Sequence, residues 1–518
     1  MFSHEAITAF LLLFWASLFI NLAFYFFVPK LFPHKKTSFF ASFTLFVSSV
    51  GILAYLIADH YTGVGINDAA FSQIRHGMKG LRWQMWLPLV GACLAVFLLV
   101  FILSIRIHKK ISLYPYRDIS KRRAAVFFTL CLSVMLINPG FLQSGTLLYK
   151  AWSAQKHIES VMLHSKYPAL PPPDVKPLSA VYIYAEGLEA TFMNEKIFPN
   201  LTPRLNRLSE KAVTIHGIKQ VGFTGWTIAG QIASNCGFPG MEGDSAFAND
   251  AARWPCASDF LAKEGYRMVY MNGSSLEFSG KGDFWKARGY SEVFGDKSVS
   301  DLAQTPDAPF STWGAYDDTL FKAAWNKYTA LLKSDKPFVL TLLTVDTHAP
   351  KGMGTPSCKN MPKYRHYENS SLVQSVHCAD RTIGDFLEKL LADLPPHVIV
   401  VLQSDHLQTP RADIFPVLRQ YEKERENLFM AWGANIEPKK IMRSATMFDT
   451  GATFLSLLGR DPQFLNLGRD LLSEQKTLVE EHGFPWMEER MRLALLDDRM
   501  QGAQEIEELR QKEAHYDE

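Results

Sequence analysis

Apolar positions follow one pattern in the first 145 residues and another in the rest of the chain. The first part contains four long apolar runs that are nearly free of charge, at 7–28, 39–57, 86–105 and 124–142. Each run is about 20 residues long, the length with which a helix crosses the hydrocarbon core of a bilayer. The pattern therefore predicts a four-helix transmembrane region over residues 1–145.

The first run has an alternative interpretation as a secretory signal peptide. Its apolar core is longer than that of a signal peptide, and no Lys or Arg precedes it. Three further apolar runs also follow it, as expected of a protein that stays in the membrane. We therefore interpret 7–28 as a membrane anchor.

The second pattern begins after a connector, 146–178, that ends in the proline-rich stretch "YPALPPPDVKP". Short, almost continuous apolar runs then alternate with helical patterns; the runs lie at 180–186, 266–272, 338–345 and 397–404. Such runs are typical of strands that are buried on both faces of a parallel sheet. The pattern predicts an α/β sandwich with a largely parallel central sheet over 179–472. It also predicts a charged, solvated helical tail over 473–518.

Basic residues in the short loops between the apolar runs give an orientation. The first and third loops carry most of them: Lys30, Lys35, Lys36, and then Arg106, Lys109, Lys110, Arg117, Lys121, Arg122 and Arg123. The second loop is longer and carries only Arg75, Lys79 and Arg82. Because cytoplasmic loops are enriched in Lys and Arg, the first and third loops are predicted to be cytoplasmic. The N-terminus and everything after residue 142 are then predicted to lie outside.

Composition and cysteine placement agree with this arrangement. The net charge is +2 with 20% charged residues, and no strongly basic domain stands out, which argues against a nucleic-acid partner. Two cysteines, Cys93 and Cys131, fall in predicted spans and are interpreted as packing residues. The other four lie in the exported part, where an oxidising compartment lets disulfides persist. Four cysteines allow three pairings, of which the simplest is Cys236–Cys256 with Cys358–Cys378.

Acids and histidines stand at the ends of three predicted strands. The first ends in Glu186, the third in "TVDTHAP" with Asp346 and His348, and the fourth in Asp405 and His406. Ligands of open α/β sheets bind outside the carboxyl ends of the strands, so these residues are predicted to form one polar site. Two carboxylates and an imidazole suit a divalent cation such as Zn²⁺ or Mn²⁺ and leave a coordination position open. The competing interpretation is that each is an ordinary polar residue in a turn.

The segment "FTGWTIAGQIASNCG" supplies a candidate nucleophile. Thr224 or Thr227 is a candidate N-cap for the helix that follows. The functional interpretation is that one threonine hydroxyl ligates the metal, which lowers its pKa and makes it a nucleophile. The N-terminus of the helix would also attract an anionic group such as a phosphate.

Several separate motifs carry a family resemblance. The stretches "VYIYAEGLEATFMNEKIFPNLTPRL", "WTIAGQIASNCG", "TLLTVDTHAP", "SDHL" and "NLGRDLL" resemble the phosphoglycerol transferases of osmoregulated periplasmic glucan synthesis. The external loop "DHYTGVGINDAA" is similar as well, so the resemblance spans most of residues 50–470. This family is sulfatase-like and belongs to the alkaline phosphatase superfamily, with lipoteichoic acid synthases and lipid A phosphoethanolamine transferases. The resemblance implies a sulfatase-like catalytic domain at the outer face of the inner membrane, in the periplasm.

The resemblance also implies roles for particular residues. The metal ligands would be Glu186, Thr227, Asp405 and His406, with one divalent Mn or Zn ion. Thr227 would be the nucleophile that becomes phosphorylated, and His348 would be a histidine on the substrate side that donates a proton to the leaving group or binds a phosphate oxygen. Candidate clamps for the phosphate or glycerol lie in "MNGSSLEFSGKGDFWKARGY": Asn272, Lys281, Trp285, Lys286 and Arg288. Each of these has the alternative of an ordinary loop residue. The family's cysteine pattern favours the disulfide pairing given above.

The implied reaction moves phosphoglycerol from phosphatidylglycerol, through a phosphothreonine, to a periplasmic glucan or another surface glycan, and releases diacylglycerol. Two departures from the family pattern matter. The glutamate motif reads Ala-Glu-Gly where the family usually has Gly-Glu-Ser. The better-known glucan-modifying members also continue beyond the catalytic domain, so the acceptor is not specified.

Four other functions are possible for a chain with these residues, and they fit the sequence less well. A sulfatase needs Cys or Ser in a Cys/Ser-x-Pro-x-Arg motif, which "CGFPG" does not provide. An alkaline phosphatase needs ligands for a second metal, and no further histidine follows soon after His406. A phosphoethanolamine transferase acting on lipid A or a glycan is the main alternative. A catalytically silent membrane sensor of lipids or glycans is a remote one, because every ligand position and the nucleophile are filled.

Overall fold

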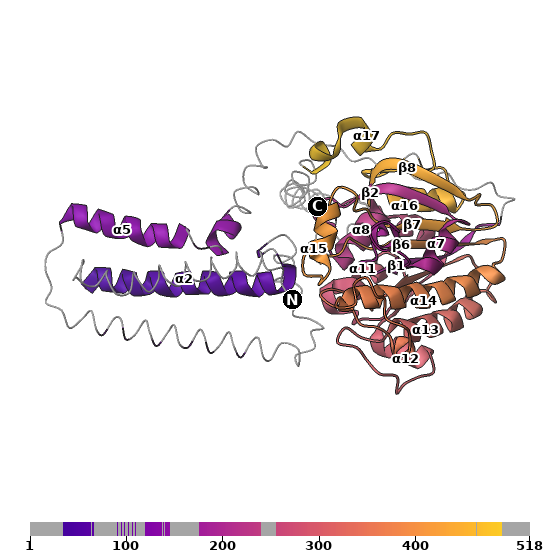
Figure 1. Cartoon of the computed structure of the whole chain (residues 1–518). Helices are drawn as coiled ribbons and strands as arrows, with labels where there is room; N and C mark the ends of the chain where they lie inside the picture. The colour runs from indigo at the N-terminus through magenta and orange to yellow at the C-terminus, as the bar shows by residue number, and fades with distance from the viewer. Residues whose placement is uncertain are drawn as a thin grey trace, which may run out of the picture. The chain divides into compact units, whose positions relative to one another are not determined.

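The computed structural model describes residues 35–63, 65–66, 120–136, 138, 140–145, 176–239, 255–462 and 464–488, with single positions at 91, 95, 98, 102, 106 and 109. The chain divides into two compact units, one within residues 1–153 and one that contains residues 154–518. Each unit is described by itself below (Figure 1).

The N-terminal unit contains two long described helices, α2 (Lys35–Thr62) and α5 (Lys121–Leu136). They pack against each other through contacts such as the edge-to-face pair of Phe40 and Phe128. Among the residues described, no helix meets the length and apolarity required to cross a membrane. The predicted spans 39–57 and 124–142 overlap α2 and α5, whereas 7–28 and most of 86–105 lie outside the described residues. The four spans therefore stay a prediction.

The C-terminal unit is built on an eight-stranded sheet with the order β4-β3-β5-β1-β6-β7-β2-β8. The strands are β1 (Ser179–Ala185), β2 (Val213–Lys219), β3 (Arg267–Asn272), β4 (Glu292–Phe294), β5 (Phe338–Leu343), β6 (Val398–Ser404), β7 (Phe429–Trp432) and β8 (Lys439–Thr446). All neighbouring strands pair in parallel except β7, which runs antiparallel to β6 and to β2. A two-stranded hairpin of β9 (Phe464–Leu465) and β10 (Gly468–Arg469) lies apart from this sheet.

Helices cover both faces of the sheet, because its central strands are apolar on both faces. Alternate residues of β1 enter two separate cores: Tyr182 and Tyr184 belong to one, Val181 and Ile183 to the other. The first core is covered by α8 (Thr227–Cys236), α10 (Ala257–Lys263), α11 (Lys281–Ala287), α16 (Asp449–Leu457) and α17 (Leu478–His482). The second is covered by α7 (Pro203–Ser209), α12 (Asp296–Leu302), α13 (Asp317–Leu331) and α14 (Ser371–Ala392). Short helical turns complete the unit: η1 (Ala190–Met193), η2 (Phe278–Gly280), η3 (Pro356–Cys358), α15 (Phe415–Leu418) and η4 (Arg419–Tyr421).

The four strands predicted from continuous apolar runs are β1, β3, β5 and β6, and they form the centre of the sheet. Both predicted disulfides, Cys236–Cys256 and Cys358–Cys378, are present. Cys131 is buried, as expected of a packing residue, and Cys93 lies outside the described residues. The predicted α/β sandwich with a largely parallel sheet is therefore confirmed.

The predicted solvated tail is wrong over the part that the structure describes, 473–488. Leu478, Val479 and Met487 are buried in the first core. Glu480 also forms an ion pair with Arg443 of β8, with 2.7 Å between Oε1 and Nε. This segment follows β8 and α16 as an integral part of the domain, because its few apolar residues complete the core that those elements begin.

A buried ion pair joins α10 to the end of α11. Arg288, whose side chain is 0% exposed, donates from Nη1 to Oδ2 of Asp259 over 2.9 Å. Burial raises the pKa of Asp259, and the neighbouring Arg288 charge opposes that rise. Removing one partner of such a pair leaves the other buried without a counter-charge.

We expect Arg288→Met to lower the free energy of unfolding by about 3 kcal/mol, since Asp259 would then be a buried carboxyl without its cation. Urea unfolding of the full chain in detergent, followed by tryptophan fluorescence, measures the change. Lys286→Met, at an exposed position on the same helix, is the matched control and should leave the midpoint unchanged. An Arg288→Met midpoint equal to that of the control would contradict the role of the pair.

Candidate metal centre and active site

Three strand ends meet at one edge of the sheet. Strand β1 lies between β5 and β6, and all three run in parallel. Glu186 directly follows β1, Asp405 directly follows β6, and His348 lies five residues beyond the end of β5. The structure therefore brings together the residues that the sequence places at the carboxyl ends of these strands.

Glu186, Asp405 and His406 form a compact, buried cluster. One ligand atom from each residue lies within 4.8 Å of the others. The Nε2 atom of His406 is 3.2 Å from Oε1 of Glu186 and 3.5 Å from Oδ2 of Asp405. The other ring nitrogen, Nδ1, is 2.7 Å from the carbonyl oxygen of Leu407. Because a carbonyl only accepts, Nδ1 donates to it, and Nε2 faces the two carboxyl groups. When Nε2 carries a proton it donates to them, and when it loses that proton its lone pair can ligate a cation.

Electrostatics within the cluster are strongly coupled. Burial acts to raise the pKa of Glu186, but the charges of His348 and His406 hold it below its ordinary value. Burial, together with the charge of Glu186, raises the pKa of Asp405 well above its ordinary value. Burial acts to lower the pKa of His406, yet Asp405 and Glu186 raise it to about 10. Without a cation, protons therefore balance the negative charge of the two carboxyl groups.

The cluster fits a divalent cation. Oδ1 of Asp405 accepts hydrogen bonds from the backbone N–H groups of Gly187, over 2.8 Å, and His406, over 2.9 Å. Oδ2 of the same carboxylate is buried and has no hydrogen-bond partner among the described residues. A buried carboxylate oxygen without a partner is costly unless a cation or a proton satisfies it. With a Glu oxygen and an imidazole nitrogen beside it, this atom completes a donor set typical of Zn²⁺ or Mn²⁺.

Thr227 lies against the cluster at the start of α8. Its hydroxyl donates to Oε2 of Glu186 over 3.1 Å. The N-cap of α8 is Trp226, without a side-chain cap bond, so the predicted N-cap role of Thr224 or Thr227 is wrong. Thr224 is fully buried and donates its hydroxyl to the carbonyl oxygen of Val221 over 2.8 Å. Of the two candidates, Thr227 is the one whose hydroxyl contacts the cluster.

A glycine sets the distance between α8 and the cluster. A Cβ atom added to Gly230 would lie 1.8 Å from the backbone oxygen of Asp405. Only a residue without a side chain allows this approach. The "TIAGQ" sequence therefore lets the helix carry Thr227 up to Glu186.

His348 stands at the mouth of the site. Its Nε2 atom is 3.9 Å from Oε1 of Glu186, and its Nδ1 atom is 2.6 Å from the carbonyl oxygen of Ala349. The side chain is 27% exposed, and the ring of Trp313 lies over it with 4.0 Å between centroids. Burial lowers the pKa of His348, so the neutral ring presents a lone pair on Nε2. Such a ring can take up and return a proton.

Asp346 takes no part in the cluster. Its Oδ2 atom accepts from the backbone N–H of Asp317, over 3.2 Å, at the start of α13. Asp317 in turn accepts from the backbone N–H of Val345 over 2.8 Å. Burial raises the pKa of Asp317 to about 7, and burial with the charge of Asp317 raises the pKa of Asp346. This pair fastens α13 to the end of β5 and so fixes the segment that carries His348.

The residues predicted to contact substrate differ in their surroundings. Asn272 and Lys281 converge on Ser274, whose hydroxyl lies 3.0 Å from Nδ2 of Asn272 and from Nζ of Lys281. Trp285 is 1% exposed and donates its indole N–H to Gln231 over 3.1 Å, and Arg288 is held by Asp259. Trp285 and Arg288 are buried, as Asn272 and Lys281 are, and substrate contact by these four residues stays a prediction. Lys286 is exposed on the surface of α11.

Some supporting residues were not found from the sequence. Gly187 has φ +56°, and an added Cβ would lie 2.4 Å from Nε2 of Gln408, which explains the departure to Ala-Glu-Gly. Thr344 accepts from the backbone N–H of Glu186 over 2.9 Å, and Thr347 donates to its carbonyl oxygen. These contacts fix the Glu186 backbone. Of these features, the sequence could have indicated only the positive φ, because glycine is the residue that adopts it without strain.

A buried network lies behind the Glu186 loop. Glu189 accepts from Nη2 of Arg425 over 2.7 Å and from the backbone N–H of Gln408 over 2.9 Å. Gln408 follows His406 by two residues, so the network connects the loop after β1 to the loop after β6. The charged pair stays inside the domain because each partner neutralises the other.

Comparisons with known proteins agree with this fold. Residues 179–460 match the family model described as Sulfatase, and residues 7–157 match the model described as Phosphoglycerol transferase I, N-terminal domain. The chain is 31% identical to Phosphoglycerol transferase I of Xanthomonas campestris pv. campestris (strain B100) over 81% of this chain and 60% of that protein. It is 32% identical to the protein of the same name from Escherichia coli O6:K15:H31 over 84% of this chain and 57% of that protein.

The chain thus spans about 60% of the length of these curated relatives. Among solved structures, a protein in the alkaline phosphatase superfamily from Vibrio parahaemolyticus aligns with a TM-score of 0.49 at 22% identity. That alignment covers 65% of this chain and 80% of the other. The family model covers more than half of the chain and contains each strand end of the site. The chain belongs to the sulfatase family, and its residues 7–157 are similar to the N-terminal domain of phosphoglycerol transferase I.

Proposed function

We propose that this protein is a membrane-anchored, metal-dependent transferase that moves phosphoglycerol from phosphatidylglycerol to a periplasmic glucan or another surface glycan, releasing diacylglycerol. The observation that carries the proposal is the hydrogen bond of the Thr227 hydroxyl to Glu186, beside Asp405 and His406. A hydroxyl held at a divalent-cation site is suited to attack phosphorus. The similarity to proteins named phosphoglycerol transferase I supports the transferred group.

The proposed cofactor is one divalent ion, Mn or Zn, held by Glu186, Asp405, His406 and Thr227. When bound, it would lower the pKa of the Thr227 hydroxyl and offset the negative charge of the phosphate. The buried Oδ2 atom of Asp405 and the Nε2 atom of His406 support this set of ligands.

The proposed reaction has two half-reactions. In the first, Oγ1 of Thr227 attacks the phosphorus of phosphatidylglycerol, and the bond from phosphorus to the diacylglycerol oxygen breaks. His348 takes the threonine proton and returns it to that leaving oxygen. In the second, a sugar hydroxyl attacks the phosphothreonine, and the bond from phosphorus to Oγ1 of Thr227 breaks. His348 takes the sugar proton and returns it to Oγ1. Placement and charge neutralisation lower most of the barrier in such transfers.

Two contacts support the proton path. The ring of Trp313 packs against His348 and restricts the orientation of its ring, and the backbone carbonyl oxygen of Ala349 accepts from Nδ1. Nε2 then faces the side of the site where Thr227 and Glu186 lie. Asn272 and Lys281, which both bond to Ser274, are the proposed contacts for the phosphate or glycerol. Lys286, at the exposed face of α11, is a further proposed contact.

The proposed location is the inner membrane, with the catalytic domain in the periplasm, several spans, and the N-terminus outside. The bilayer would then present the lipid donor. Two disulfides within the catalytic domain support an oxidising compartment. The match of residues 7–157 to the N-terminal domain of phosphoglycerol transferase I supports the membrane region.

Protein incubated with phosphatidylglycerol and Mn²⁺ is expected to gain a glycerophosphate adduct on Thr227, detected by peptide mass spectrometry, with diacylglycerol released. Thr227→Ala should form no adduct and should lower turnover on the order of 10⁴-fold or more. Thr224→Ala, which removes a hydroxyl bonded only to the backbone, is the matched control and should still form the adduct.

Two results would contradict the proposed donor. An ethanolamine-phosphate adduct that forms only with phosphatidylethanolamine would make the protein a phosphoethanolamine transferase. No adduct with either lipid would favour a catalytically silent sensor.

Metal affinity is expected to rise with pH. Below a pKa of about 10, His406 carries a proton that a cation must displace, so binding should tighten at least tenfold per pH unit between about pH 6 and 8. Isothermal titration with Mn²⁺ in buffers of different ionisation enthalpy measures both the affinity and the protons released. His406→Gln should weaken binding and remove its share of the released protons. A pH-independent affinity would rule out His406 as a ligand.

We expect His348→Gln to lower kcat by about 10²- to 10⁴-fold, because it removes a proton-transfer group. Mn²⁺ affinity should not change, since His348 is not a proposed ligand. His366→Gln, at an exposed histidine, is the control for a neutral substitution. A loss of metal binding in His348→Gln would instead place this histidine among the ligands.

A further inference from the structure

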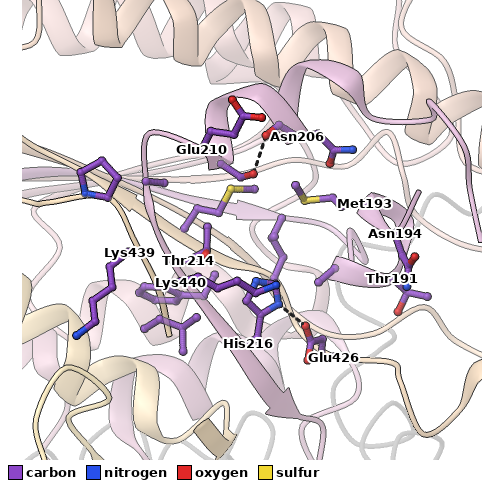
Figure 2. Close-up of a pocket in the computed structure, with 18 of the residues that line it drawn as sticks. Thr191, Met193, Asn194, Asn206, Glu210, Thr214, His216, Glu426, Lys439 and Lys440 are labelled. Atoms are coloured by element: carbon purple, nitrogen blue, oxygen red, sulfur yellow. Dashed lines mark hydrogen bonds and ion pairs between the residues drawn. The ribbon is translucent and has the colours of Figure 1, made fainter. Parts of the chain in front are cut away.

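A second cavity lies on the face of the sheet that carries η1, separate from the metal centre. Its volume is about 660 Å³, within the range of about 300–1,000 Å³ typical of small-molecule sites. The walls come from η1, α7, β2, β7 and the start of β8. Figure 2 shows polar side chains from these elements around the cavity. Glu186, Asp405 and His406 do not line it.

One wall carries a polar group that lacks a partner. The Thr191 side chain is 4% exposed, and its hydroxyl has no hydrogen bond among the described residues. A hydroxyl buried in this state destabilises the fold relative to one that has a hydrogen-bond partner. Because Thr191 lines the cavity, a ligand with its own hydroxyl groups could satisfy it.

The lining also includes an imidazole in a fixed orientation, that of His216. Nδ1 of His216 is 2.7 Å from Oε1 of Glu426, and Oε2 of the same carboxylate accepts from the backbone N–H of Gly217 over 2.7 Å. Both carboxylate oxygens are thus engaged, and Nε2 of His216 is left for the cavity. Thr214 lies two residues earlier on β2 and projects from the same face of the strand (Figure 2).

Charge and polarity indicate the class of ligand. The lining includes three acids, Glu210, Glu424 and Glu426, and two lysines, Lys439 and Lys440. These nearly cancel, so the cavity offers no net attraction to an anion. Hydroxyl, amide and imidazole groups alternate with apolar surface from Met193 and Met430. Such mixed surfaces suit a ligand with hydroxyl groups on an apolar ring.

We infer that this cavity binds a neutral sugar unit, and that the protein thereby holds part of its acceptor glycan away from the metal centre. The identity of the glycan as acceptor rests on the proposed function; the binding of a sugar does not. The cavity is joined to the active site through the backbone. Ala190 donates from its N–H to the carbonyl oxygen of Glu426 over 3.0 Å, directly beside the Glu189–Arg425 pair behind Glu186.

Binding is tested without chemistry, on full-length Thr227→Ala protein without metal, in a detergent that has no sugar headgroup. Saturation-transfer NMR and titration calorimetry are run with neutral glucose disaccharides and with a glucuronic-acid disaccharide. The neutral sugars should bind more tightly than the acidic one. Thr191→Val should weaken neutral-sugar binding by about two- to tenfold, the value of one hydrogen bond. Thr214→Trp, at a partly exposed position, should fill the cavity and abolish binding.

Thr382→Val is the matched control, because Thr382 is a buried threonine whose hydroxyl bonds to Ala379 on α14. It should leave sugar binding unchanged. Three results would each overturn the inference. They are no binding of the neutral sugars, binding by Thr191→Val and Thr214→Trp as tight as by the parent protein, and tighter binding of the acidic sugar.

A second readout separates this inference from the proposed function. With Thr227 intact, Thr214→Trp should form the phosphothreonine adduct at the normal rate but show a higher KM for the glycan. A protein that binds sugar in the cavity yet forms no adduct would refute the proposed reaction and leave the sugar site standing. An adduct with an unchanged glycan KM would remove the cavity from the acceptor path.

Discussion

Two carboxyl groups lie buried side by side at the end of the central strands, and the rest of the site follows from the need to stabilise them. Glu186 and Asp405 each lose most of their hydration there. Uncompensated burial of two negative charges costs several kcal/mol per ion. Backbone N–H groups satisfy one oxygen of Asp405, His406 supplies an imidazole to both residues, and one oxygen remains for a cation. The cluster is therefore stabilised by a positive charge, at the same place where the Thr227 hydroxyl lies.

This arrangement depends on small features of the backbone. Strands β1 and β6 pair in parallel up to Ala185 and Ser404, so their next residues, Glu186 and Asp405, emerge together. Gly187 then adopts a left-handed conformation, which turns its N–H to Asp405. Gly230 lets α8 touch the backbone of Asp405. A Cβ at Gly230 would push α8 away from the backbone of Asp405, and a side chain at Gly187 would be strained by the positive φ.

The sequence predicts the centre of the fold and of the site better than their edges. Strands β1, β3, β5 and β6 are continuous apolar runs because helices cover both their faces, and their ends carry the reactive side chains. The outer strands carry no such signal: β8 is largely exposed, and β4 has only three residues. The roles of Trp285 and Arg288 also depend on tertiary packing. A Trp and an Arg have the right chemistry for a substrate clamp, but only packing decides which way a helix turns them, and here both side chains are buried.

In the proposed reaction, the choice of acceptor would have to be made outside the metal centre. The cation, Thr227 and His348 would act on the phosphorus and on the attacking hydroxyl, and they would not contact the rest of the molecule that carries that hydroxyl. Transition-state contacts far from the reacting atoms supply such discrimination. Within the described part of the catalytic domain, the cavity beside η1 offers fixed polar groups and the unsatisfied hydroxyl of Thr191. Thr191 follows Glu186 by only five residues. A change of acceptor between related enzymes could therefore occur by substitutions on β2, η1 and β8 while the metal ligands stay the same.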